Sequence, residues 1–162
     1  MIFFVPKYCF NLIISIITIP IALLFYSFNL MGIKETYIMI LRKHNDIIPP
    51  IVPPILLEFI VLGEDRKYFY HFGIDPIAII RAIFANFRGE LQGASTITQQ
   101  YIRILSRNYE MTYKRKIKEI FLALLLNSKF EKIDVIQKYL AIAYYGYNME
   151  GINDVCKKII TY

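Results

Sequence analysis

The hydrophobic positions of the chain form one long uninterrupted run, followed by shorter runs broken by polar residues. The long run, from Tyr8 to Ile33, contains 26 residues and no Asp, Glu, Lys or Arg. A helix needs about 20 such residues to cross the hydrocarbon core of a bilayer. Its length and its flanking residues Lys7 and Lys34 favour a transmembrane anchor, and membrane helices tolerate an internal proline such as Pro20.

Two other interpretations of this run fit less well. A cleaved signal peptide has an apolar region of about 7–15 residues and a small-residue cleavage site, which Ala22 and Ser27 do not supply. A buried core helix of this length exceeds what a small domain can cover. We therefore expect a cytoplasmic tip at residues 1–7 and an anchor at 8–33. This orientation places the residues after the anchor outside the cytoplasm. Because more basic residues follow the run than precede it, the charge count alone favours the opposite orientation, with the residues after the run in the cytoplasm.

Beyond the anchor, we expect a connector at residues 34–54 and one domain at residues 55–162. Residues 33–46 are expected to be a short helical or extended connector. The proline-rich stretch 47–56 excludes a continuous helix there. It is either a rigid linker or an apolar lip on the bilayer surface.

The spacing of apolar residues in the domain predicts a mainly α-helical, all-α fold without long alternating runs. Helical spacing begins at residue 55 and is interrupted at Gly63, and helices are predicted over 76–87, 96–107, 112–127 and 131–145. Asp75 is expected to cap the helix at 76–87, and Ser95 or Thr96 the next one. The predicted core residues of the helix at 76–87 are Ile77, Ile80 and Phe84, and the apolar run 120–126 belongs to a later helix.

Composition narrows the possible functions. The chain has 162 residues, of which 56% are hydrophobic and 20% charged, too apolar for a disordered protein. Two cysteines cannot form a disulfide framework. The net charge of +6 indicates an anionic partner, such as phosphate, acidic lipid or nucleic acid.

Three polar segments carry candidate chemistry, and each has a plain structural alternative. Residues 64–75 contain three acids and a histidine, which alone would suit a polar loop with a helix cap. Residues 93–100 place hydroxyl and amide side chains beside glycine, which suits a capped helix start or a phosphate cradle. Arg115 and Glu119 lie one helical turn apart, the spacing of an ordinary surface ion pair.

In combination, these segments resemble glycosyltransferase family 51, the peptidoglycan polymerases. The family includes the transglycosylase domains of class A penicillin-binding proteins and the monofunctional biosynthetic transglycosylases. The resemblance spans about Pro54 to Gly151. Its motifs, in chain order, are Glu64-Asp65-x-x-Tyr68-x-x-His71-x-Gly73-x-Asp75, Arg81-Ala82 with Asn86, the segment from Gln92 to Gln100, Arg115-Lys116-x-x-Glu119, and Lys132-x-x-Val135-Ile136-x-x-Tyr139-Leu140 followed by Tyr145-Gly146.

The resemblance implies a lysozyme-like domain on a single membrane helix, on the periplasmic or exterior side of the bacterial cytoplasmic membrane. It implies polymerisation of lipid II into β-1,4-linked glycan strands with release of undecaprenyl pyrophosphate. The implied partners are lipid II, the growing strand, the membrane and other cell-wall synthesis proteins. No cofactor is required by the sequence, with Mg²⁺ or Mn²⁺ as the candidate metal ions.

The resemblance also assigns roles to residues. Glu64 is the general base on the acceptor 4-hydroxyl, and Glu119 is the second acid, organising the pyrophosphate through basic residues or a metal. The substrate-binding candidates are Arg81, Asn86, Ser95, Thr96, Thr98, Gln99, Gln100, Arg103, Arg115 and Lys116. The residues expected to be structural are Asp65, Tyr68, His71 and Gly73.

The chain departs from the family pattern in a few places. Tyr68 stands where Phe is usual, Ile104 replaces an asparagine and Ala141 replaces another. Family members continue for several helices beyond Gly151. The alternative function is therefore a non-catalytic membrane-anchored remnant that binds lipid-linked precursor or a cell-wall partner. Peptidoglycan cleavage is a weaker alternative, and nucleic-acid binding is disfavoured because the basic residues follow no such motif.

Overall fold

The computed structural model describes residues 5–90 and 92–160, so part of the predicted cytoplasmic tip lies outside the described residues. The described chain is mainly helical and contains no strand, which confirms the predicted all-α class. The α-helices are α1 (Val5–Ser27), α2 (Ile33–Asp46), α3 (Pro54–Glu64), α4 (Pro76–Phe87), α5 (Ile97–Ser106), α6 (Tyr113–Lys129), α7 (Lys132–Ile142) and α8 (Ile152–Ile160). Short 3₁₀ turns occupy Leu30–Gly32 and Tyr68–Tyr70.

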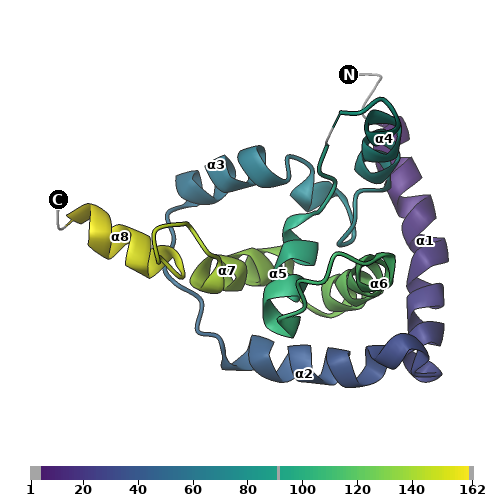
Figure 1. Ribbon diagram of the computed structural model, residues 1–162, viewed down its shortest axis with the longest axis horizontal. Helices are drawn as coiled ribbons and strands as arrows, with labels where there is room; N and C mark the ends of the chain where they lie inside the picture. The colour runs from purple at the N-terminus through teal and green to yellow at the C-terminus, as the bar shows by residue number, and fades with distance from the viewer. Residues whose placement is uncertain (1–4, 91, 161–162) are drawn as a thin grey trace.

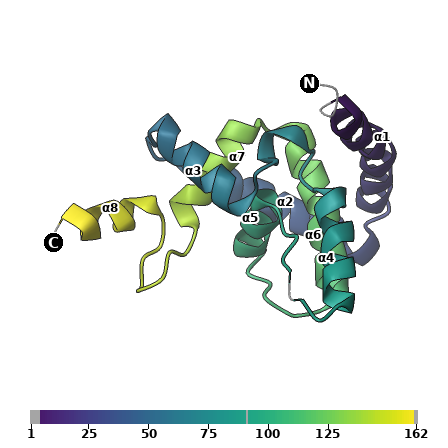
Figure 2. The ribbon, with the colours of Figure 1, turned by 90° about the horizontal axis from the view of Figure 1, so that it is seen from above.

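The helices surround a centre formed by α5, α6 and α7 (Figure 1). Helix α2 runs below this centre, α3 lies above it and α1 rises along one side. Helix α8 projects at the opposite end from α1, as the view from above also shows (Figure 2).

Helix α1 ends at Ser27 and turns sharply into α2. Asn29, Met31 and Gly32 have positive φ angles in this turn. Among the described residues, no single helix combines the length and hydropathy needed to cross a bilayer. The segments Ile16–Ser27 and Leu30–Asp46 together have the required length and hydropathy, but the chain bends by 103° between them. The anchor at 8–33 therefore remains a prediction.

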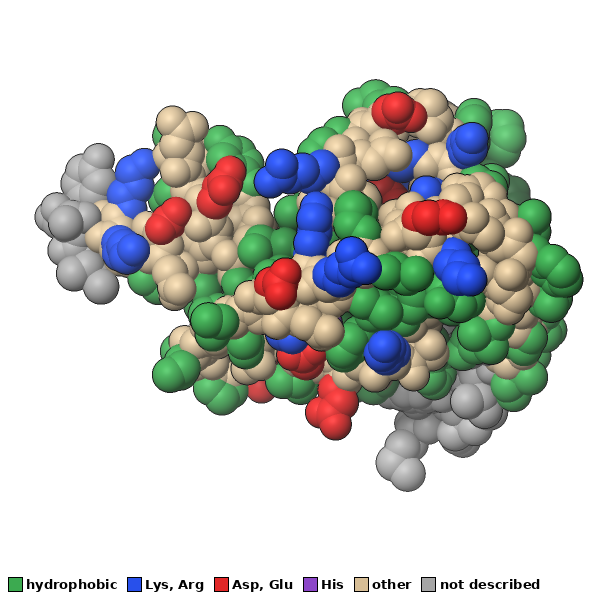
Figure 3. All heavy atoms as spheres, turned by 90° about the horizontal axis from the view of Figure 1, so that it is seen from below, with side chains coloured by type: hydrophobic (Ala, Val, Ile, Leu, Met, Phe, Trp, Pro, Cys, Tyr) green, Lys and Arg blue, Asp and Glu red, His purple; other side chains and the backbone are tan. Residues whose placement is uncertain are grey.

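The lower half of α1 packs against the domain. The rings of Phe25 and Phe121 are stacked with centroids 4.2 Å apart, and Ala22 is fully buried. Ile13, Ile16 and Ile17 of α1 are apolar and more than half exposed. In the space-filling view from below, hydrophobic side chains cover much of the α1 end of the molecule, while basic side chains gather near the middle (Figure 3).

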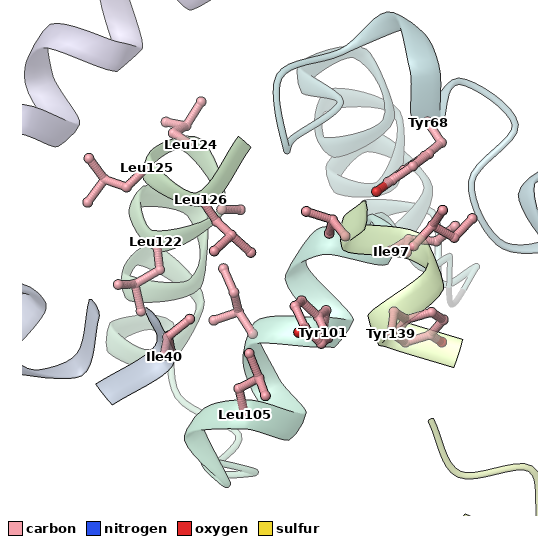
Figure 4. Packing of buried hydrophobic residues seen from close by; sticks show 14 of the residues in the cluster. Ile40, Tyr68, Ile97, Tyr101, Leu105, Leu122, Leu124, Leu125, Leu126 and Tyr139 are labelled. Carbon is pink, nitrogen blue, oxygen red and sulfur yellow. The ribbon is translucent and has the colours of Figure 1, made fainter. Parts of the chain in front are cut away.

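The core forms where the apolar faces of α5, α6 and α7 meet (Figure 4). Tyr101 and Ile102 of α5 are fully buried, and so are Ile136 and Leu140 of α7. The predicted apolar run of α6 supplies the residues 122–126, all buried. Burial of such side chains stabilises the fold by about 1.5–3 kcal/mol each. This core holds α5, which carries Gln100 and Arg103.

Helix boundaries agree well where a local capping signal exists. The Asp75 side chain accepts hydrogen bonds from the backbone of Ile77 and Ala78 at 3.0 and 3.1 Å, which confirms its predicted cap. Of the two candidate caps for α5, Thr96 is the one used, in a capping box with Gln99. Helix α7 ends three residues earlier than predicted, at Ile142, and α8 was not predicted.

The predicted core of α4 is wrong. Ile80 and Phe84 are 48% and 63% exposed, and Ile77 is only partly buried. The face of α4 that packs inward carries the small residues Ala82 and Ala85. Helical spacing identifies an apolar face, but it does not say whether protein covers that face.

Candidate functional site

A cavity of about 460 Å³ opens at the point where α3 ends and α4 begins. The carboxyl end of α3, the start of α4 and the segment before α5 form its walls. Its lining residues are Leu62, Gly63, Glu64, Asp65, Arg66, Lys67, Asp75, Ala78, Arg81, Gln92, Gly93, Ala94, Ser95 and Thr96. The cavity thus brings together the motif that begins at Glu64 and the segment that begins at Gln92, which start about 30 residues apart in the sequence.

Glu64 is the last residue of α3 and its side chain is exposed to the cavity. Gln100, on α5, donates a hydrogen bond from Nε2 to Glu64 Oε2 at 3.1 Å. The carboxylate is therefore held by one donor and remains open to solvent. A carboxylate in this setting can accept a proton from a hydroxyl group placed in the cavity.

Asp65 and His71 hold the wall of the cavity against α5. Asp65 is buried, and both of its carboxylate oxygens lie about 3 Å from His71 Nε2, at 3.1 and 3.0 Å. The same carboxylate accepts a hydrogen bond from the backbone N–H of Ile97 at 3.2 Å. Because these contacts are internal, they suit the scaffold role expected for both residues.

Gly73 is placed where another residue would not fit. Its φ angle is +86°, and an added Cβ would come within 2.5 Å of the carbonyl oxygen of Ala123 on α6. Its own carbonyl oxygen accepts a hydrogen bond from Thr96 Oγ1 at 2.6 Å. The loop therefore lies directly against α6 and the start of α5.

Tyr68 is fully buried and joins the first motif to α7. Its hydroxyl donates to the carbonyl oxygen of Lys132 at 2.9 Å, and the Lys132 ammonium lies 4.3 Å from the centroid of the Tyr68 ring. Among the described residues, Lys132 Nζ has no hydrogen-bond partner. Burial lowers the pKa of the Lys132 amine to about 7, and the charge of Asp65 opposes that shift.

Glu119 lies at the centre of a basic cluster. It is 2% exposed and accepts hydrogen bonds from Arg103 Nε and Nη2 at 2.9 and 3.2 Å. Arg115, one turn before it on α6, also donates to Oε1, and Lys116 Nζ lies 3.8 Å from Oε2. Hydrogen bonding to Glu119 raises the pKa of Arg103, and burial lowers the pKa of Lys116. The ion pair between Arg103 and the buried Glu119 therefore joins α5 to α6.

Ser95 connects this basic cluster to the cavity. Its hydroxyl lines the cavity and accepts hydrogen bonds from Lys116 Nζ at 2.7 Å and Arg103 Nη2 at 3.5 Å. Arg81, on α4, also lines the cavity and is exposed. An anionic group in the cavity would therefore lie near cationic side chains of three different helices, and such charge-assisted contacts are among the strongest made to phosphate.

Other predicted substrate-binding residues have internal contacts. Thr98 is buried and accepts a hydrogen bond from Asn127 Nδ2 at 2.9 Å. The Gln99 side chain is buried, and its Oε1 accepts a hydrogen bond from the backbone N–H of Thr96. Asn86 is exposed and accepts a hydrogen bond from the backbone N–H of Gln92. These contacts hold the backbone, and a role of these side chains in binding stays a prediction.

The metal prediction finds little support in this geometry. Within the described ranges, no group of three or more His, Cys, Asp or Glu side chains could hold a metal ion. Glu119 is already surrounded by three cationic side chains, which would repel a divalent cation. The residues around Glu119 do not fit Mg²⁺ or Mn²⁺ in this arrangement.

Two residues of the site were missing from the predicted set. Lys67 lines the cavity and forms an ion pair with Asp75 at 3.1 Å. Tyr139, on α7, donates a hydrogen bond to Gln100 Oε1 at 2.8 Å. Lys67 lies inside the motif that begins at Glu64, and Tyr139 lies inside the motif that begins at Lys132. The motifs therefore marked both segments without indicating which side chains turn toward the site.

Comparison with known proteins supports the resemblance to the peptidoglycan glycosyltransferases. Residues 35–159 match the family described as Transglycosylase. The chain is 35% identical over 127 residues to penicillin-binding protein 1A of Aquifex aeolicus, an alignment that covers 77% of this chain and 16% of that protein.

Two further relatives give similar values. Identity is 40% over 103 residues to penicillin-binding protein 1A of Escherichia coli, covering 62% of this chain and 12% of that protein. It is 38% over 98 residues to penicillin-binding protein 1B of Haemophilus influenzae, covering 59% and 12%. The chain thus spans less than a fifth of the length of these curated relatives. The match over most of its residues shows that the chain belongs to the transglycosylase family, glycosyltransferase family 51.

Proposed function

We propose that this chain is a peptidoglycan glycosyltransferase that polymerises lipid II into β-1,4-linked glycan strands and releases undecaprenyl pyrophosphate. The observation that supports it best is the cavity itself. An accessible carboxylate, Glu64, lines the same cavity as Arg81, Lys67 and Ser95, with the Glu119 cluster behind Ser95. Family membership supplies the reaction class.

The reaction places two demands on the protein. The 4-hydroxyl of the acceptor sugar must lose its proton as its oxygen bonds to the anomeric carbon of the donor. The bond from that carbon to the lipid pyrophosphate breaks at the same time, and the pyrophosphate leaves with the electron pair. In our proposal Glu64 takes the proton, a contribution typical of general bases and worth about 10²–10⁴-fold in rate.

The cationic residues receive the leaving group. Arg81 and Lys67 are in the cavity wall, and Arg103 and Lys116 reach it through Ser95. Their role is to neutralise the charge that develops on the pyrophosphate as the bond breaks. A single displacement of this kind inverts the anomeric centre and needs no covalent sugar–enzyme intermediate, in contrast to a retaining glycosidase.

Substrate access through the membrane is part of the proposal. The exposed face of α4 carries Ile80, Ile83, Phe84 and Phe87, and Arg81 of the same helix lines the cavity. Contact of this face with the outer leaflet of the cytoplasmic membrane would bring the cavity to the depth of the lipid pyrophosphate. The same contact fits a domain on the periplasmic or exterior side, beside the predicted anchor.

The test uses the full chain in detergent with labelled lipid II. Wild type is expected to produce long glycan strands, and Glu64→Gln to lose about 10²-fold or more of that activity. Glu58→Gln is the matched control, because Glu58 is an exposed residue of the same helix that does not line the cavity. Lipid II that binds to wild type but forms no strands would contradict the polymerase and favour the precursor-binding remnant.

A further inference from the structure

The carboxylate of Glu64 is connected to α7 by two consecutive hydrogen bonds through Gln100. Tyr139 Oη donates to Gln100 Oε1 at 2.8 Å, and Gln100 Nε2 donates to Glu64 Oε2 at 3.1 Å. The three residues come from α7, α5 and α3. Together they form a hydrogen-bonded chain from the buried Tyr139 to Glu64, the proposed base.

The Tyr139 side chain is held in place by its burial in the core. Tyr139 is only 8% exposed and belongs to the hydrophobic cluster that includes Ile97 and Tyr101 (Figure 4). Burial, together with the nearby charge of Glu64, raises the pKa of Tyr139 to about 12. The phenol therefore keeps its proton at neutral pH and remains a hydrogen-bond donor.

The orientation of the Gln100 amide follows from its two neighbours. An ionised carboxylate accepts hydrogen bonds and cannot donate them, so the NH₂ group must face Glu64. The opposite orientation would place the amide oxygen against the carboxylate. The Tyr139 hydroxyl secures the favourable orientation from the other end, because it donates to the amide oxygen.

We propose that Tyr139 is a positioning residue that, by holding the amide of Gln100, keeps the Gln100 NH₂ group on the Glu64 carboxylate. The proposal rests on the proposed function only in taking Glu64 as the base. Tyr139 acts through Gln100 and touches neither substrate nor reacting atoms. Because a phenol can also accept a hydrogen bond, it can serve the reversed amide orientation when Glu64 has taken up a proton.

Other charged groups face the same carboxylate and must be held constant in a test. Asp65, Arg66, Lys67 and Arg81 line the cavity with Glu64. Tyr145, in the segment after α7, has its pKa raised by burial first and then by the nearby groups Tyr139, Cys156 and Glu64. The substitution that removes the Tyr139 hydroxyl leaves the four charged residues of the cavity in place, and the Tyr145 variant measures the contribution of the group that interacts with Tyr139.

The test observes Gln100 directly by NMR. The chain has four glutamines, so labelling with ¹⁵N-glutamine gives four side-chain amide signals. In Tyr139→Phe, the Gln100 amide signals are expected to move and to exchange with solvent about fivefold faster, the factor expected for a single hydrogen bond. The buried Gln99 amide is expected to stay unchanged and serves as an internal reference.

Tyr145→Phe is the matched control. It is the same chemical change close to Glu64, and the buried Tyr145 hydroxyl has no hydrogen-bond partner among the described residues. Its Gln100 signals should match wild type. Unchanged Gln100 signals in Tyr139→Phe, or an equal change in Tyr145→Phe, would overturn the proposal.

A second measurement separates this proposal from the proposed function. If wild type polymerises lipid II, the acidic limb of the pH–rate profile should move to higher pH in Tyr139→Phe, because the Gln100 NH₂ group that donates to the charged carboxylate is no longer held in place. Gln100→Leu should move the limb in the same direction, and the double variant should move it no further. If the pH shifts of the two single variants add in the double variant, Tyr139 does not act through Gln100 and the proposal is refuted. Absence of strands with wild type rejects the polymerase, while the NMR result still decides the role of Tyr139.

Discussion

The cap of α4 offers a prediction whose parts can be separated with two substitutions of one residue. Asp75 is 5% exposed, and its two carboxylate oxygens have different partners. Oδ1 accepts hydrogen bonds from the backbone of Ile77 and Ala78, and Oδ2 pairs with Lys67 at 3.1 Å. Asp75→Asn keeps an oxygen for the cap and removes the ion pair, whereas Asp75→Ala removes both.

The magnitudes follow from these contacts. Loss of an N-cap costs about 1–2 kcal/mol. The ion pair contributes less, about 0.5 kcal/mol, because the Lys67 side chain is 32% exposed. We therefore expect Asp75→Ala to lower the free energy of unfolding by about 2 kcal/mol and Asp75→Asn by about 0.5 kcal/mol. For a chain of this size, these values correspond to Tm decreases of about 4–8 °C and 1–2 °C.

The assay is thermal unfolding of the detergent-solubilised protein followed by far-UV circular dichroism. Amide hydrogen exchange at Ile77 and Ala78 gives a local readout, since both N–H groups lose their acceptor in Asp75→Ala but keep it in Asp75→Asn. Equal losses of stability in the two variants would refute the reasoning, because they would mean that the ion pair with Lys67, and not the cap, carries the contribution of Asp75.

The remaining predictions concern Gly73 and Lys132. Gly73→Ala should destabilise the protein by about 1–3 kcal/mol more than Gly89→Ala. Both glycines have positive φ, but only at Gly73 would a Cβ meet backbone atoms, those of Ala123; equal losses in chemical denaturation would contradict this. The unfolded state binds more protons at Lys132 than the folded state between pH 7 and about 10, because burial lowers the pKa of the folded amine to about 7. The contribution of Lys132 to stability should therefore rise with pH across this window, and unfolding measured at pH 7 and 9.5 should lose that part of its pH dependence in Lys132→Met. An unchanged dependence would show that the amine remains charged in the fold.

Local signals in the sequence predicted the helices well. Asp75 before Pro76 and Thr96 three residues before Gln99 are capping patterns, and both caps are present. Capping depends on side chains and amides within about one turn, so neighbouring residues contain the information. The end of α7 and the presence of α8 carry no comparable signal, and these were mispredicted or missed.

The apolar face of α4 shows where periodicity stops being sufficient. The spacing of Ile77, Ile80 and Phe84 correctly predicts a helix, but the fold buries Ala82 and Ala85 instead. A hydrophobic face can be covered by protein or by another apolar surface, and the sequence pattern is the same in both cases.

The candidate site also combines features that the sequence predicts with features that depend on the tertiary structure. The sequence by itself determined the motif spacing and the helix caps, because both depend on residues close together in the chain. Only the tertiary structure decided that Glu119 is buried between Arg103 and Arg115 and that Tyr139 reaches Glu64 through Gln100. These contacts join helices distant in sequence, and the packing of α5 against α6 and α7 determines which side chains meet and how strongly their charges interact.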